Sequence, residues 1–269
     1  MYDAATGCER EGGVQRKTAT TARDVSGQAK PPLLELAGVT VRLNGAEVLR
    51  DVSLRASDRR IAIVGRNGSG KTTLARVIAG LQPVDAGTAT IGGSDMARDR
   101  KAALRAVGIL FQNPDHQIIF PTVEEEISFG LLQLGQGRDA AREATREILA
   151  RFGKSHWAEA ATHALSQGQK QLVCLMSVLA MRPALIVLDE PYSGLDIPTR
   201  MQLMRHVDGV DATVVQITHD PASVRHYDRV VWIDEGRVRQ DGPAAEVLAA
   251  FEQQMTAWGG ADDLSDLAG

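Results

Sequence analysis

The chain has 269 residues, of which 43% are hydrophobic and 24% are charged, and a formal net charge of −4 at pH 7. A chain of this length buries enough surface to fold without a disulfide or a structural metal. Its two cysteines, Cys8 and Cys174, form no paired framework, and the first residues hold no apolar stretch typical of a secretory signal. We therefore expect a protein of a reducing compartment with no overall basic surface for nucleic acid.

The first part of the chain changes character at residue 33. Residues 1–32 are polar and without periodicity, so we expect a disordered extension that ends at Pro31 and Pro32. The stretch "VTVRLNGAEVL" then alternates around Asn44 and Gly45, which is typical of a β-hairpin. An antiparallel β region is therefore expected directly after the extension.

Short apolar runs without alternation follow along the chain, and they indicate strands that are buried on both faces. These runs are "IAIV" (61–64), "VGILF" (107–111), "LIVL" (185–188), "VVQI" (214–217) and "VVWI" (230–233). Residues 138–152 and 122–135 have helical character, and Gly153 is a natural helix stop. We expect a mostly parallel sheet with a helical subdomain at about 114–182, and a C-terminal tail over 252–269.

The stretch "GRNGSGKT" matches the phosphate-binding pattern G-x-x-x-x-G-K-S/T, and it lies between an expected strand and an expected helix. Its glycines let backbone N–H groups face a phosphate at the helix N-terminus. Lys71 is expected to reach the β- and γ-phosphates, and the Thr72 hydroxyl to bind Mg²⁺. The expected nucleotide-binding residues are Gly65, Arg66, Asn67, Gly68, Ser69, Gly70, Lys71, Thr72 and Thr73.

The stretch "LIVLDEP" brings two carboxylates to the end of a buried strand. Asp189 is placed to hold Mg²⁺ directly or through water, and Glu190 to act as general base on an attacking water. A surface pair of acidic residues after a strand is the alternative, which the neighbouring phosphate motif disfavours.

A second glycine-bearing turn, "LSQGQKQ" (165–171), opens another expected helix. Ser166 is a natural N-cap, and the free N–H groups near Gly168 make a second anion site. One nucleotide does not need two such sites from one subunit.

At this point the chain resembles the ATP-binding cassette (ABC) ATPases, whose signature motif is LSxGQ. The resemblance covers roughly residues 33–251, and the motifs come in the family's order: "GRNGSGKT", Gln112, "LSQGQKQ", "LIVLDEP", "SGLD" (193–196) and "THD" with His219. It implies an α/β P-loop NTPase fold of the ABC type, with an N-terminal antiparallel β region and a helical subdomain. It also implies ATP hydrolysis with Mg²⁺ as cofactor.

The resemblance also assigns roles to residues. The signature residues Leu165, Ser166, Gln167, Gly168 and Gln169 are expected to contact ATP bound to a partner ATPase subunit. His219 is expected to contact the γ-phosphate in its own site, Asp196 to connect the two sites, and Gln112 to sense the metal ion and the attacking water. Single structural roles, such as Asp196 as a helix N-cap, remain alternatives.

Two positions depart from the family pattern. The residue expected to stack on adenine is usually aromatic, whereas this chain has Leu43 with Val41 nearby, so a preference for ATP over GTP is left open. Gln167 replaces the commonest glycine of the signature. Because one P-loop and one signature are present, we expect a dimer, either of identical or of two related ATPases.

The stretch "FQNPDHQIIFPTVEEEISFG" (111–130) resembles the energy-coupling factor (ECF) branch of the family and, within it, the ATPases of biotin transporters. That resemblance implies partners in the membrane, namely a coupling subunit and a small substrate-binding subunit, with the ATPase at the cytoplasmic face. Thr122 and Glu125 form a capping-box pattern, which accounts for part of the acidic run. We expect exposed apolar residues at 117–120 to dock a helix of the coupling subunit.

Three alternatives stay open from the sequence. The first is import of cobalt or nickel ions by the same machinery. The second is a soluble ABC ATPase acting on DNA or ribosomes, which the missing coiled-coil insertion, the single cassette and the missing basic stripe disfavour. The third is a P-loop kinase, which would have no use for LSxGQ.

Overall fold

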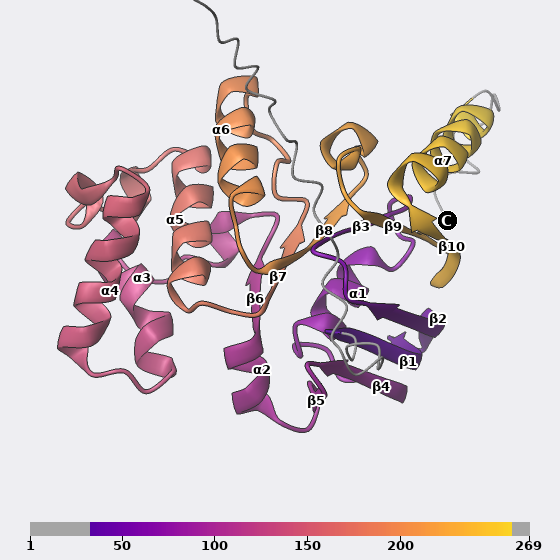
Figure 1. The fold of residues 1–269 in the computed structure, drawn as a ribbon, viewed down its shortest axis with the longest axis horizontal. Coiled ribbons are helices and arrows are strands. Elements are labelled where there is room, and N and C mark those ends of the chain that lie inside the picture. The colour runs from indigo at the N-terminus through magenta and orange to yellow at the C-terminus, as the bar shows by residue number, and fades with distance from the viewer. Residues whose placement is uncertain (1–32, 260–269) are drawn as a thin grey trace, which may run out of the picture. The chain divides into compact units, whose positions relative to one another are not determined.

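The computed structural model describes residues 33–259. The expected extension over 1–32 and the last part of the expected tail, 260–269, lie outside the described residues. Within 33–259 two sheets and their helices form a mixed α/β fold (Figure 1).

The first sheet is antiparallel, with the order β2-β1-β4-β5. Its strands are β1 (Leu34–Leu43), β2 (Ala46–Ala56), β4 (Ala86–Ile91) and β5 (Ser94–Asp95). The expected hairpin is confirmed, because Asn44 and Gly45 join β1 to β2 with φ values of 51° and 82°. Both residues tolerate the left-handed backbone that a tight hairpin turn requires.

The second sheet has the order β10-β9-β3-β8-β7-β6, with all neighbours parallel except the pair β9–β10. Its strands are β3 (Arg60–Val64), β6 (Val107–Leu110), β7 (Leu185–Asp189), β8 (Thr213–Thr218), β9 (Arg229–Asp234) and β10 (Arg237–Pro243). The five apolar runs are thus strands, as expected, and the mostly parallel core sheet is confirmed.

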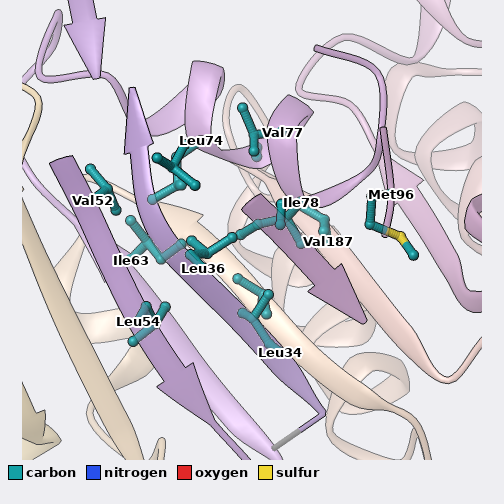
Figure 2. Close-up of a cluster of buried hydrophobic side chains, with 14 of the residues drawn as sticks. Leu34, Leu36, Val52, Leu54, Ile63, Leu74, Val77, Ile78, Met96 and Val187 are labelled. Carbon is teal, nitrogen blue, oxygen red and sulfur yellow. The ribbon is translucent and has the colours of Figure 1, made fainter. Parts of the chain in front are cut away.

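Helix α1 (Lys71–Ile78) packs against strands of both sheets. Figure 2 shows Leu74, Val77 and Ile78 of α1 in one buried cluster with Leu36 of β1 and Ile63 of β3. At about 25 cal/mol per Å² of buried apolar surface, such a cluster is a main source of stability. Since α1 begins at Lys71, this packing also fixes the phosphate loop.

The opposite face of the second sheet is covered by α7 (Ala244–Gly259) over β3 and β9, and by α5 (Gln167–Ala180) and α6 (Ile197–Asp208) over β6, β7 and β8. Helix α2 (Arg100–Ala106) precedes β6. We expected the ATPase domain to end at residue 251, but α7 continues to Gly259, and Met255 and Trp258 pack against the same cluster as Phe251.

Helices α3 (Val123–Gln133), α4 (Arg138–Arg151) and α5 pack on one another and form the helical subdomain (Figure 1). Gly153 follows α4 with a φ of 66°, as expected for a helix stop. Both expected N-caps are present, each as a reciprocal capping box: Thr122 with Glu125 begins α3, and Ser166 with Gln169 begins α5.

Candidate active site

Four parallel strands bring the sequence motifs to one edge of the second sheet. The phosphate loop follows β3, Gln112 follows β6, Asp189 ends β7, and His219 follows β8. A cavity of about 330 Å³ lies at this edge. Its lining residues are Val48, Asn67, Gly68, Gly70, Lys71, Thr72, Thr73, Gln112, Glu190 and His219.

The phosphate loop holds its lysine in place from within. The Lys71 ammonium group donates to the carbonyl of Gly65 at 2.8 Å and to that of Arg66 at 2.6 Å. Burial lowers the pKa of Lys71, while the nearby charges of Glu190 and Asp189 raise it, and the net effect is a lowered pKa. The ammonium group is thus positioned before any phosphate arrives.

The loop has the geometry of an anion cradle. Gly68 and Gly70 have φ values of 81° and 101°, a backbone region that residues other than glycine rarely adopt. A Cβ atom on Gly70 would also lie 2.9 Å from the Val48 carbonyl oxygen. The Ser69 hydroxyl is buried without a hydrogen-bond partner in the structure described, and a phosphate oxygen is a suitable acceptor for such a group.

Thr72 and Asp189 lie together, with 3.4 Å between the threonine hydroxyl and a carboxylate oxygen. Both supply oxygen, the ligand type that Mg²⁺ prefers, so the residues present fit the ion. Burial raises the pKa of Asp189, and the hydrogen bond from Thr72 opposes that shift. A cation beside this carboxylate would stabilise its charged form.

Glu190 is held by its neighbours in an unusual backbone conformation. Its φ is 49°, which costs a non-glycine residue about 1 kcal/mol. One carboxylate oxygen lies 2.7 Å from His219 Nδ1, and the other accepts from the Thr218 hydroxyl at 3.5 Å. The carboxylate thus lines the cavity with its direction fixed from two sides.

Gln112 also reaches the cavity, and its amide lies 3.4 Å from the Ser193 hydroxyl. The signature residues do not line this cavity. Two of them lie beside α6 and the turn before it instead: a Cβ on Gly168 would collide with Thr199, and the Gln167 side chain lies against Gly194. The structure therefore brings together the expected residues from the phosphate loop, Asp189, Glu190, Gln112 and His219, but not the signature.

Asp196 has a defined local role, because its carboxylate accepts from the Thr199 N–H at 2.8 Å and caps α6. Hydrogen bonds from the side chain and backbone of Thr199 lower the pKa of Asp196. Val41 is fully buried and cannot reach a base, whereas Leu43 is partly exposed at the end of β1.

Three residues near the phosphate loop were not found from the sequence. Val48 lines the cavity from β2. Gly236 donates to the Ser69 carbonyl at 3.0 Å and supports the loop from the β9–β10 turn. Trp258 of α7 lies 4.7 Å from the Arg66 guanidinium. The pair Glu235-Gly236 is a turn pattern in the sequence. That pattern does not indicate a contact with the phosphate loop, because the two segments are far apart in the sequence.

Residues 49–193 match the family model described as ABC transporter. A relative from Rhodobacter capsulatus, named "Biotin transport ATP-binding protein BioM", is 47% identical over 83% of this chain and 96% of its own length. The chain belongs to the ABC transporter ATP-binding family. It is therefore an ATPase, as the motif order predicted.

Two further similarities place this ABC ATPase within the family. The energy-coupling factor transporter ATP-binding protein EcfA1 of Levilactobacillus brevis is 36% identical over 76% of each chain. The structure of cbiO1 from Clostridium perfringens, part of the ABC transporter complex cbiONQ, is similar with a TM-score of 0.72 and 28% identity. That similarity covers 89% of this chain and 99% of the other. The expected resemblance to the ECF branch is confirmed.

Across residues 33–259, none of the helices has both the length and the apolar character needed to cross a bilayer.

Proposed function

We propose that this ABC ATPase is the ATP-hydrolysing subunit of an ECF importer that takes up biotin, working at the cytoplasmic face of the cell membrane. The observation that carries the proposal is the cavity in which Lys71, Glu190, Gln112 and His219 meet while the signature lies outside it. Such a half-site is completed by a second ATPase subunit. The cargo is inferred from the name of the Rhodobacter capsulatus relative.

In the proposed mechanism, ATP lies between the phosphate loop of one subunit and Ser166 and Gly168 of the partner. Lys71 neutralises charge on the β- and γ-phosphates. Thr72, Asp189 and Gln112 would hold Mg²⁺, which when bound neutralises further charge on the phosphates.

Glu190 takes a proton from water as the water oxygen bonds to the γ-phosphorus and the bond to the bridging oxygen breaks. His219, 2.7 Å from that carboxylate, and Thr218 keep it directed at the water. Phosphate and ADP then leave, and the dimer opens. Asp196 links the two sites in this proposal. Its carboxylate caps α6 at Thr199, and both Thr199 and Gly194 contact signature residues.

Import of cobalt or nickel ions is the alternative cargo, because ECF importers for different micronutrients share this type of ATPase. The 47% identity to the biotin transport protein of Rhodobacter capsulatus favours biotin. A soluble ABC ATPase without membrane partners is the remaining alternative.

The hydrolysis step is tested with Glu190→Gln. We expect it to bind ATP with unchanged affinity but to hydrolyse it about a hundredfold more slowly, because the general base is lost while the phosphate contacts remain. Nucleotide titration and phosphate release measure the two effects. Glu235→Gln is the matched control, since Glu235 also has a positive φ of 46° but is exposed on the β9–β10 turn. Full turnover by Glu190→Gln would remove Glu190 from the proposed role.

The transport step is tested by tagging the Glu190→Gln protein and purifying it from gently solubilised membranes. Co-purification of a multi-helix membrane protein and a small membrane protein that binds biotin supports the proposal. Bound cobalt or nickel in place of biotin would shift the cargo to the alternative. Purification with soluble partners alone would contradict transport.

The proposed docking surface for the coupling subunit is a groove of about 330 Å³. It is lined by Asp115, Ile118, Ile119, Phe120, Pro121, Thr162, His163 and Lys170. Among the expected apolar residues, Ile119 is 66% exposed. Ile118 packs toward the core of α5 and α6, and Phe120 lies against Phe129 with ring centroids 4.9 Å apart.

The three glutamates after this groove each have an intramolecular contact. Glu124 pairs with Arg142 at 3.3 Å, and Glu125 completes the capping box. Glu126 is 5% exposed and accepts from the N–H groups of Ile119 and Phe120 at 2.9 and 3.0 Å. Capping and loop support thus account for the acidic run, and Ile119 is left as the residue best placed for a partner.

Ile119→Asp tests docking more sharply than changes at Ile118 or Phe120, which would disturb internal packing. We expect Ile119→Asp to lose the membrane subunits on purification while ATP binding and the melting temperature stay unchanged. A charge in place of an apolar contact disfavours a helix in the groove. Leu81→Asp, which changes another exposed apolar residue (54% exposed), is the control and should retain the partners. Retained assembly in Ile119→Asp would contradict this docking surface.

A further inference from the structure

The backbone of one residue, Phe111, is held on both sides by glutamine side chains. The N–H of Phe111 donates to Gln117 Oε1 at 3.2 Å, and the carbonyl of Phe111 accepts from Gln171 Nε2 at 3.1 Å. Phe111 lies between the end of β6 and Gln112. The residue directly before the cavity-lining glutamine is therefore fixed by two side chains from elsewhere in the sequence.

The two glutamines come from the two segments that bind other subunits in the proposed function. Gln117 directly precedes Ile118 and Ile119 of the docking groove, and its amide also donates to the Ile109 carbonyl at 3.4 Å. Gln171 lies in the first turns of α5, just after the signature. An ion pair of 2.7 Å between Lys170 and Asp115 joins the same two segments again.

Gln171 is 2% exposed, and its Oε1 atom has no hydrogen-bond partner among the described residues. A buried acceptor without a partner costs about 1–3 kcal/mol of folding free energy. A residue that only fills space at this position would not need to carry that cost. A hydrophobic side chain of similar length would fill the same space without that cost. The amide is explained by its single bond to the Phe111 carbonyl.

We propose that Gln117 and Gln171 are positioning residues that hold the backbone of Phe111 from both sides and thereby direct Gln112 into the cavity. This inference rests on the proposed function, since it takes Gln112 to act on the attacking water. A shift of the docking loop acts on the Phe111 N–H through Gln117. A shift of the signature helix acts on the Phe111 carbonyl through Gln171. Both shifts act on the backbone of Phe111, next to the residue that touches the reaction.

Two features of the geometry support joint action. The N–H and the carbonyl of Phe111 each have one side-chain partner, so neither glutamine can replace the other. The two bonds hold the adjacent peptide groups 110–111 and 111–112 and thus fix the backbone torsions of one residue, so the effects of removing them are not independent. A misplacement of about 1 Å at a reacting group is enough to slow a reaction substantially.

The test uses the full chain with Gln117→Met, Gln171→Met and the double variant. We expect each single variant to lower kcat for ATP about tenfold while KM for ATP changes by less than about twofold, because the contacts of the phosphate loop with ground-state ATP stay intact. The double variant should be little slower than either single variant, because both act through the backbone of Phe111. In hydrogen exchange, the Phe111 amide of Gln117→Met should exchange at least about tenfold faster than in the wild type.

Gln216→Met is the matched control. Gln216 is fully buried and bonds to Tyr227 and Ser223, away from the Phe111 peptide. It should lower the melting temperature without lowering kcat per folded molecule. Should Gln171→Met fail to fold, the Gln117→Met variant, at a partly exposed position, still gives both readouts.

Three results would overturn the inference: kcat within twofold of the wild type in both single variants, multiplied effects in the double variant, or unchanged exchange of the Phe111 amide in Gln117→Met. Failure of the proposed function is distinguishable, because the tagged Glu190→Gln protein would then purify without membrane subunits, whereas the kinetic and exchange measurements use the purified chain alone.

Discussion

Asp189 and Glu190 lie next to each other at the end of β7, and both are held in conditions that do not favour stability. Asp189 is buried with a raised pKa, and Glu190 has a left-handed backbone. Strain and burial of this kind cluster where a site is prepared for chemistry. The folded chain therefore bears a cost here that a bound cation and nucleotide would offset.

The first prediction follows from the raised pKa of Asp189. The pKa of Asp189 in the folded chain lies above the usual 3.8. The stability of the fold therefore falls as the pH rises from 3.8 through the pKa of the folded chain, and it stays lower at higher pH. Asp189→Asn should therefore raise the melting temperature of the nucleotide-free protein at pH 7 by about 2–4 °C. Scanning calorimetry at pH 7 and below pH 4 measures this, because the gain should disappear at the lower pH.

The same variant should lose Mg²⁺-dependent hydrolysis of ATP, since a neutral amide is a poor ligand for that ion. Asp211→Asn is the control, because that carboxylate is exposed and forms only a loose pair with Arg59. A lower melting temperature in Asp189→Asn at pH 7 would show that the charged form is stabilised in the folded chain.

Among the secondary-structure elements, α7 has a link to the nucleotide site that no sequence motif indicated. The Arg239 guanidinium lies 4.3 Å from the Trp232 ring and 5.7 Å from that of Trp258, and Arg66 lies on Trp258. Arg239 also bonds to Asp234 and to Gln254 of α7. A series of stacked cations and aromatic rings thus joins the C-terminal helix to the phosphate loop.

The second prediction concerns this stack. Trp258→Ala should weaken ATP binding about threefold and lower the melting temperature by a few degrees, since a partly exposed cation–π contact contributes roughly 0.5–1 kcal/mol. Trp258→Phe should restore most of the affinity. Titration with a fluorescent ATP analogue and calorimetry provide the measurements.

Trp157→Ala is the matched control for Trp258→Ala. Trp157 also stacks with a cation, Lys154 at 4.8 Å, but it lies in the helical subdomain. It should affect the melting temperature and leave ATP affinity unchanged. Equal ATP affinity in Trp258→Ala and the wild type would show that α7 stabilises the fold without acting on the phosphate loop.

At the scale of the whole molecule, the separation of the signature from the cavity makes the single chain an incomplete ATPase in our proposal. The surface beside Asp196 is consistent with a second subunit, because Ile197 and Met201 of α6 are 75% and 57% exposed. Apolar side chains at such positions are typical of an interface. A homodimer is the simplest assembly that provides two complete sites.

The third prediction is that hydrolysis by the purified chain rises with the square of its concentration while the dimer is scarce. Glu190→Gln should elute as a dimer in size-exclusion chromatography with ATP, and as a monomer without it. Adding Ile197→Lys should keep it monomeric with ATP bound, because a charge is then buried in the interface. Leu104→Lys, on α2, is the control for the added charge. A rate per chain that does not depend on concentration would contradict a shared site.

Much of the fold was determined by local sequence. The hairpin at Asn44 and Gly45, the buried strands and the capping boxes at Thr122 and Ser166 all formed where the sequence predicted them. In each case neighbouring residues carry the whole signal: backbone freedom, apolar periodicity, or a side chain within reach of its own backbone. The residues collected at the cavity edge were also predictable, because motifs that follow parallel strands meet at one edge of the sheet.

Tertiary structure alone decided how the segments contact one another. Residues 117–120 read as one exposed apolar stretch, yet only Ile119 is strongly exposed, because α3 and α5 bury part of its neighbours. Trp258 on Arg66 and the two glutamines on Phe111 join positions up to 192 residues apart. Such contacts depend on how helices pack on the sheet, and that packing is set by the shape of many side chains at once, which a local pattern does not contain.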